Sequence, residues 1–236
     1  MDERLMAVRP HPDQINTAAN IRAILKDSPM LERYRGHRVQ DALSIRCMPQ
    51  LHGPVKKAVK DAQATLAIEL NSSVDNPLIF DEEDGGAVAL MGCNADGTYA
   101  GMASDNLCIA ITDLCKMSNS RIDRLLNSLV SELPAFLNKN ADFNNGLMMI
   151  QYASAGLQGE LRILAAELIC DGQALDCYDD KRCAKGTQAI YDLLRSKVPE
   201  MDNDMPLTPY LEAVAQQIID RAYIRTVEAS VGALKF

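Results

Sequence analysis

Residues 102–130, MASDNLCIAITDLCKMSNSRIDRLLNSLV, form a proline-free run that decides the fold class. Along it, apolar side chains recur every three or four residues, at Leu107, Ile111, Leu114, Met117, Ile122, Leu125, Leu126 and Leu129. This spacing predicts one long α-helix. The first half of the run is apolar or small on nearly every face, through Ala103, Cys108, Ile109, Ala110 and Cys115. Such helices are normally surrounded by others, so the run also predicts a bundle.

The same helical spacing occurs on both sides of this run. Upstream, a helix is predicted over 55–66 from Val55, Ala58, Val59, Ala62 and Leu66. Downstream, Thr208-Pro209 has the pattern of an N-cap followed by an N1 proline, ahead of an apolar helix face. Two more helices are predicted at about 147–175 and 184–198, and the polar stretch 138–145 is predicted as a loop.

Strand signal is confined to one short region. Leu78-Ile79-Phe80 and residues 87–90 flank the acidic segment 81–86, which predicts a small hairpin. The acidic tip lacks EF-hand spacing and the distal Glu, so a solvated turn is favoured over a calcium site, and we predict no metal site. The sequence thus predicts an all-α fold, a bundle of long helices with one minor β-hairpin, in a single domain over residues 1–236.

Composition excludes several classes of protein. The chain of 236 residues is 47% hydrophobic, which excludes bulk disorder. Surface scaling for its mass predicts roughly 10,500 Å² of folded surface. A formal net charge of −8 supplies no basic face for phosphates, so we predict no nucleic-acid partner. No apolar run reaches the length of a membrane span, so none is predicted.

The cysteines and the first residues predict the compartment. The seven cysteines are scattered and form no CxxC pair. Reduced, mostly buried thiols are therefore predicted. The charged start Met1-Asp2-Glu3-Arg4 is unlike a secretory signal. Together these features predict a cytoplasmic protein.

Four local strings indicate a family. They are VQDALSIRCMPQ (39–50), ELNSSVDNPL (69–78), GCNADG (92–97) with ASDNL (103–107), and NNGLMMIQ (144–151). In this order and spacing they resemble the C-terminal half of the histidine/phenylalanine (aromatic amino acid) ammonia-lyase family, over about residues 4–180. The resemblance implies a long-helix bundle that assembles as a homo-oligomer, a dimer or a tetramer, with active sites shared between subunits.

The resemblance also implies a reaction. These enzymes eliminate ammonia from an aromatic or imidazole amino acid and leave an α,β-unsaturated acid. Their electrophile is a methylidene-imidazolone that forms from an internal Ala-Ser-Gly. The implied partner of this chain is accordingly a small amino-acid substrate or another carboxylate ligand.

Two residues of the first string are candidate catalytic residues by this resemblance. Arg46 matches the arginine that holds the substrate carboxylate, and a planar permanent cation suits that task. The alternative is an Arg on a polar helix face, paired with Asp41 or with a neighbouring subunit. Gln40 matches a family glutamine near the substrate, where it orients a polar group or, alternatively, caps a helix.

Three residues are predicted to shape a substrate pocket that departs from the family pattern. Leu43 replaces the usual tyrosine and offers no exchangeable proton. Asn94 and Ala95 lie in the third string, and Ala95 replaces a pocket phenylalanine, which widens the pocket. Outside the pocket, His52 is predicted to be a packing histidine, and Asp75-Asn76-Pro77 a structural turn.

The largest departure concerns the electrophile. The chain contains no Ala-Ser-Gly string, and in Ala153-Ser154-Ala155-Gly156 an alanine separates serine from glycine. After Leu164 the family's next segment is missing, and 166–176 resembles a helix from beyond it. We therefore predict no cofactor in this chain and no activity from it alone. The alternatives are a non-catalytic helical oligomerisation module and a carboxylate-binding remnant.

Overall fold

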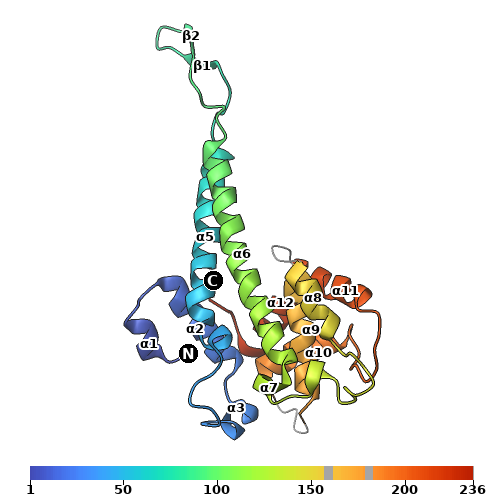
Figure 1. Cartoon of the computed structure of the whole chain (residues 1–236). Helices are drawn as coiled ribbons and strands as arrows, with labels where there is room; N and C mark the ends of the chain where they lie inside the picture. The colour runs from blue at the N-terminus through green and yellow to red at the C-terminus, as the bar shows by residue number, and fades with distance from the viewer. Residues whose placement is uncertain (157–161, 179–182, 236) are drawn as a thin grey trace.

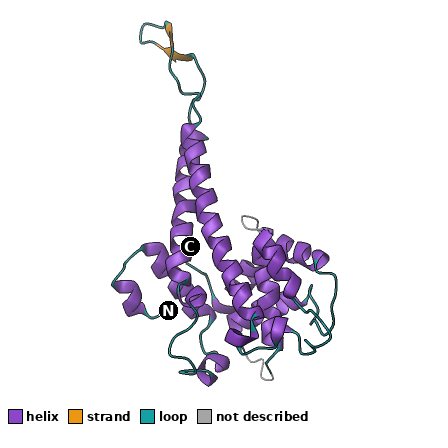
Figure 2. Ribbon diagram, in the orientation of Figure 1, coloured by secondary structure: helices purple, strands orange, loops and turns teal. Residues whose placement is uncertain are grey.

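The structure, a computed structural model, describes residues 1–156, 162–178 and 183–235. These residues form twelve α-helices, one short 3₁₀ helix and one two-stranded sheet (Figure 2). The prediction of a helical fold with one minor hairpin is confirmed. Among the described residues, no helix has the length and hydropathy needed to cross a bilayer.

The N-terminal region consists of short helices that flank the base of a long one. They are α1 (Glu3–Ala7), α2 (Pro12–Ile24), α3 (Pro29–Arg33) and α4 (Leu43–Arg46). Prolines begin α2 and α3, where the missing N–H costs nothing, and the Ser28 hydroxyl accepts the Leu31 N–H at 3.4 Å. The C-terminal segment returns to α2, because Asn20 hydrogen-bonds both the N–H and the carbonyl of Lys235.

Helices α5 (Met48–Glu69) and α6 (Thr98–Leu126) lie side by side and project away from the rest of the chain (Figure 1). The hairpin of β1 (Leu78–Asp81) and β2 (Ala87–Leu90) forms the far end, with Leu78 opposite Leu90. We call residues 63–114 the stalk. No residue of the stalk is buried.

The remaining helices form a packed unit, which we call the body, over residues 115–231. It comprises the end of α6, then α7 (Ser128–Ser131), η1 (Ala135–Leu137), α8 (Met148–Gly156), α9 (Arg162–Asp176), α10 (Lys185–Arg195), α11 (Thr208–Ile219) and α12 (Ala222–Val231). Helix α9 lies at its centre and packs against α6, α8, α10 and α11. The fully buried side chains of the body include Ile122, Ile150, Ile163, Ile169, Leu194 and Val214.

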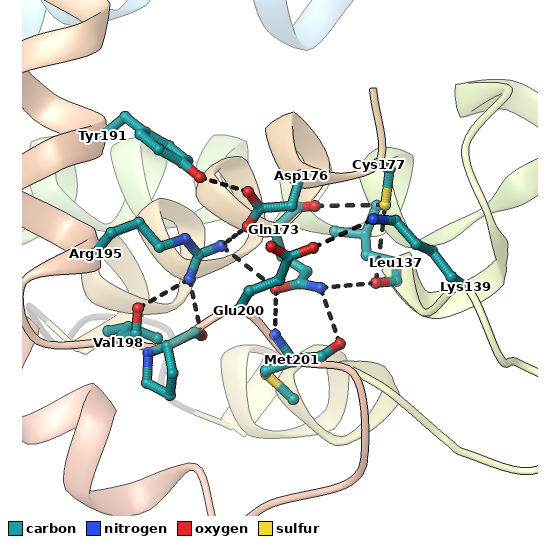
Figure 3. Close-up of polar contacts among 11 residues, drawn as sticks. Leu137, Lys139, Gln173, Asp176, Cys177, Tyr191, Arg195, Val198, Glu200 and Met201 are labelled. Carbon is teal, nitrogen blue, oxygen red and sulfur yellow. Dashed lines mark hydrogen bonds and ion pairs between the residues drawn. The ribbon is translucent and has the colours of Figure 1, made fainter. Parts of the chain in front are cut away.

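A buried polar network ties α9 to α10 and to the segment after α10 (Figure 3). The carboxylate of Asp176 is fully buried, forms an ion pair with Arg195 and accepts a hydrogen bond from the Tyr191 hydroxyl. The Gln173 amide donates to the Met201 carbonyl and accepts from the Met201 N–H, both at 3.1 Å. A buried charge needs such compensation, so the network fixes how these elements meet.

Three helix boundaries differ from the sequence prediction. The long helix predicted over 102–130 ends at Leu126, because Asn127 leaves helical geometry and its side chain accepts the Leu129 N–H to begin α7. Thr208 is the first residue of α11 and Leu207 takes the N-cap position. The helix predicted over 147–175 corresponds to α8 and α9, and residues 157–161 between them lie outside the described part.

Two further predictions need correction. The first half of α6 is not surrounded by other helices within the described part of the chain: α5 covers one side, and Ile109 remains 65% exposed. The thiols are not mostly buried, since Cys115 and Cys170 are buried while Cys93 and Cys108 on the stalk are exposed. The stalk extends beyond the packed core, which accounts for the exposure of Ile109, Cys93 and Cys108. The accessible surface of 14457 Å² accordingly exceeds the roughly 10,500 Å² of a compact chain of this mass.

Candidate functional site

The structure brings three of the predicted site residues together at the base of the stalk. Gln40 precedes α4, while Leu43 and Arg46 are its first and last residues. All three are exposed, and the Leu43 side chain is 64% exposed. Within the described residues, Arg46 has no ion-pair partner, so the alternative of an Arg46–Asp41 pair is not what the structure shows. The guanidinium faces solvent and remains available to an outside carboxylate.

The other two predicted residues lie elsewhere. Asn94 and Ala95 follow β2 at the far end of the stalk, where both are exposed and the Asn94 amide donates to the Ser73 carbonyl at 3.4 Å. Helix α5 separates them from α4, and its 22 residues span about 33 Å. A single copy of the chain therefore places the two groups of predicted site residues at opposite ends of the stalk.

The turn at Asp75-Asn76-Pro77 joins the chain segments that enter and leave the hairpin. The Asp75 carboxylate accepts the Asn76 N–H at 2.8 Å, and the Asn76 side-chain oxygen accepts the Gly92 N–H at 2.9 Å. The Asn76–Pro77 peptide bond is cis. These contacts are local and backbone-directed, as the predicted structural role requires.

His52 lies on α5 among charged groups that the sequence did not place near it. Burial lowers its pKa to about 4, the nearby Arg121 guanidinium acts in the same direction, and Glu167 opposes them. His52 is therefore neutral at neutral pH, which agrees with its prediction as a packing residue.

Sequence reasoning missed an ion pair between α6 and α9. The Arg121 guanidinium pairs with the Glu167 carboxylate through two hydrogen bonds, and the two side chains are 7% and 12% exposed. Arg121 also donates to the Ser44 carbonyl at 3.2 Å, which ties the pair to α4. The sequence contains a signal for this ion pair. Arg121 lies four residues from each of the apolar residues Met117 and Leu125, on the apolar face of the predicted helix, where a charge needs a buried partner.

The residues present do not fit the family cofactor. Ser154, the serine nearest to an Ala-Ser-Gly arrangement, is fully buried within α8. Its hydroxyl contacts the Asn119 side-chain oxygen at 2.6 Å and donates to the Gln151 carbonyl at 2.9 Å. Cyclisation needs a glycine nitrogen directly after the serine, and Ala155 stands there. No step through a methylidene-imidazolone can be derived from this chain.

Comparisons with known proteins agree with the fold. The family described as aromatic amino acid lyase matches residues 1–197. Histidine ammonia-lyase 2 of Fusobacterium nucleatum is 34% identical, over 99% of this chain and 53% of its own length. Among solved structures, histidine ammonia-lyase from Trypanosoma cruzi matches with a TM-score of 0.86 at 28% identity, over 98% of this chain and 50% of that one. Tyrosine aminomutase from Streptomyces globisporus matches with a TM-score of 0.84 at 26% identity, over 97% of this chain and 54% of that one.

The chain belongs to the aromatic amino acid lyase family. More closely, it is a homologue of histidine ammonia-lyases, and it spans about half the length of the curated relatives it matches.

The alignment with histidine ammonia-lyase 2 of Fusobacterium nucleatum also bears on the predicted missing segment. This alignment extends over 275 residues, more than the 236 of the chain, so the relative holds residues in this stretch that the chain lacks. The predicted junction after Leu164 falls within α9, which runs unbroken from Arg162 to Asp176. Ile163 and Ala165 on either side of it are fully buried, so this part of the helix is integrated into the core. The position of the deletion stays a prediction.

Proposed function

We propose that this chain supplies the carboxylate-binding helical half of an ammonia-lyase-type site, with the electrophile provided from outside these 236 residues. The observation that supports this most directly is the solvent-facing Arg46 guanidinium, uncommitted to any described residue, within the family string 39–50. Two parallel hydrogen bonds from a guanidinium would fix the orientation of a substrate carboxylate. Gln40, exposed near it, would orient a polar group of the same substrate.

The neighbouring residues limit what the chain contributes to the chemistry. Leu43 lies three residues before Arg46, on the same side of α4, and its side chain has no proton to give or accept. The acid–base step and the electrophile would both come from other groups. On this proposal the chain binds and orients an amino acid, and alone it does not eliminate ammonia.

The separation of the predicted site residues supports assembly with a second copy. If Arg46 and the Asn94–Ala95 segment line one pocket, they must come from different copies, because one copy holds them at opposite ends of the stalk. We propose a homo-oligomer for this reason, and a cytoplasmic location because the cysteines of the described residues form no disulfide.

Mixing the chain with the N-terminal half of a histidine ammonia-lyase that carries Ala-Ser-Gly tests the proposal. Ammonia release and product absorbance are measured for the chain alone and for the mixture. The proposal predicts no turnover alone, turnover in the mixture, and at least about a hundredfold loss with Arg46→Ala, the scale of a buried charged contact. Arg4→Ala, an exposed arginine paired with Asp2, is the matched control and should have no effect.

A second candidate function is a helical oligomerisation module without chemistry. The exposed apolar side chains of the stalk favour it: Ile68 is 68%, Leu70 84%, Tyr99 72% and Met102 69% exposed. The same mixing experiment separates the two, because a module would assemble stably with the added half and yield no product. Turnover that survives Arg46→Ala would contradict the proposed carboxylate role.

A further inference from the structure

The segment that carries the candidate site residues has little backbone support of its own. The backbone of residues 38–41 forms no hydrogen bond within the described part of the chain, and the Val39 side chain is fully exposed. Arg121 attaches the following helix α4 to the body through the Ser44 carbonyl, at 3.2 Å. This contact lies after Gln40, so the course of the chain around Gln40 also needs an attachment before it.

That second attachment is centred on the carboxylate of Glu132, directly after α7. Arg38 forms an ion pair with Glu132 and donates to the Val130 carbonyl at 2.9 Å. His37 Nε2 lies 2.7 Å from the same carboxylate. This His37 contact, with the Arg38 charge acting in the same direction, holds the pKa of Glu132 below its usual range. We call His37, Arg38 and Glu132 the clasp; its several contacts set it apart from a lone exposed ion pair, which contributes little.

The backbone at Glu132 has a conformation that favours glycine. Its φ of 64° and ψ of 17° lie in the left-handed region. Its N–H donates to the Ser128 carbonyl at 3.3 Å and so caps the C-terminus of α7. Helices commonly end with glycine in this conformation, because a side chain carries a steric cost there. A glutamate at this position therefore indicates a task for its side chain, and the clasp is what that side chain forms.

We propose that Glu132 is a positioning residue for the candidate site. Through Arg38 it fixes the course of the segment that carries Gln40 and Arg46. This inference rests on the proposed function and deepens it, since Glu132 itself would touch no substrate. The Glu132 side chain is exposed, so its removal leaves no cavity in the core. Loss of the clasp should therefore loosen the site and leave the body folded.

Fluorescence anisotropy of the full chain tests the clasp without any enzymatic activity. The chain contains no tryptophan, so Val39→Trp introduces a single probe at an exposed position of the segment. In that background, Glu132→Gly should at least about double the amplitude of nanosecond depolarisation, because the segment loses one attachment. Asp27→Gly is the matched control and should leave the anisotropy unchanged. Asp27 is also an exposed acid with a left-handed φ, of 57°, and it has no ion-pair partner among the described residues.

Steady-state kinetics test the consequence for a substrate, with histidine as the probe and the chain mixed with the N-terminal half of a histidine ammonia-lyase. Glu132→Gly should raise KM about tenfold and change kcat less than about threefold, since weakened binding acts on ground and transition states alike. Glu132→Gln keeps an acceptor for Arg38 and should restore most of the KM. Arg38→Ala combined with Glu132→Gly should raise KM no more than the larger single substitution, because Glu132 acts through Arg38.

The two measurements distinguish failure of this inference from failure of the proposed function. Unchanged anisotropy or unchanged KM in Glu132→Gly would overturn the positioning role, and so would an equal effect of Asp27→Gly. A loss of helical content in Glu132→Gly would also overturn it, because Glu132 would then serve the stability of the body. Absence of turnover with the unmodified chain would contradict the proposed function, and the anisotropy alone would then decide whether the clasp holds the segment.

Discussion

The body and the stalk share the long helix α6, but residues are buried in the body and not in the stalk. Every residue of the main core cluster lies between Cys115 and Ala215, whereas residues 63–114 contain no buried residue. On α6, Ile122 is fully buried while Ile109, nearly four turns earlier, is 65% exposed. The periodic pattern of apolar residues continues across this boundary without a break.

The spacing of apolar residues therefore predicts which side of a helix makes contacts, but not whether the contacting groups belong to the same chain. In the body, α9 and its neighbours satisfy the pattern of α6. In the stalk, α5 covers one side and nothing in the described chain covers the others. We infer that the exposed stalk side chains are interface residues, as the proposed homo-oligomer requires.

The largest expected effect is in the body, at the buried ion pair of α9 and α10. Asp176→Ala leaves the Arg195 guanidinium, 13% exposed, without its carboxylate, so we expect the free energy of unfolding to fall by about 3–5 kcal/mol. Chemical denaturation measures it. Lys139→Ala removes an exposed pair with Glu200 and should cost about 1 kcal/mol or less. Similar losses in the free energy of unfolding for both variants would contradict the role of the buried Asp176–Arg195 pair in stabilising the body.

Two matched substitutions on α6 measure the difference in burial between the body and the stalk. Ile122→Ala leaves a cavity in the core and should cost about 2–5 kcal/mol in denaturant unfolding. Ile109→Ala changes an exposed position and should cost less than about 0.5 kcal/mol at concentrations too low for assembly. If the free energy of unfolding fell as much in the Ile109 variant as in the Ile122 variant, Ile109 would have to be packed in the isolated chain.

His52 provides a pH test at the base of the stalk. Its pKa is lowered to about 4 in the folded chain, so between about pH 4 and 6.5 the unfolded state binds more protons and stability falls as the pH is lowered. His52→Gln should abolish about 2 kcal/mol of that loss. His11→Gln, at an exposed histidine, should leave the pH profile unchanged, and the same profile in the His52 variant would contradict the burial of His52.

Much of the fold could be predicted from sequence because local rules determine it. The spacing of Ala58 and Ala62 predicted α5, and the segments around Asp81–Gly86 predicted the hairpin in its observed place. The end of α6 at Leu126 was missed, because the Asn127 cap interrupts the helix while the apolar spacing continues to Leu129.

The candidate site could be predicted only in part. The four strings identified the family, and Arg46 lies on the surface as a ligand contact requires. The distance between α4 and the Asn94–Ala95 segment was not accessible, because it depends on the direction of the stalk. The Arg121–Glu167 pair was missed as well, since it depends on how α6 and α9 pack together.

Light scattering of the purified full chain over a range of concentrations tests whether the stalk is an interface between copies of the chain. We expect a mass that is a multiple of 25.9 kDa. The double substitution Met102→Glu and Ile109→Glu should reduce this mass toward that of a single chain, while the body keeps its helical content. A monodisperse species of 25.9 kDa at every concentration would contradict it.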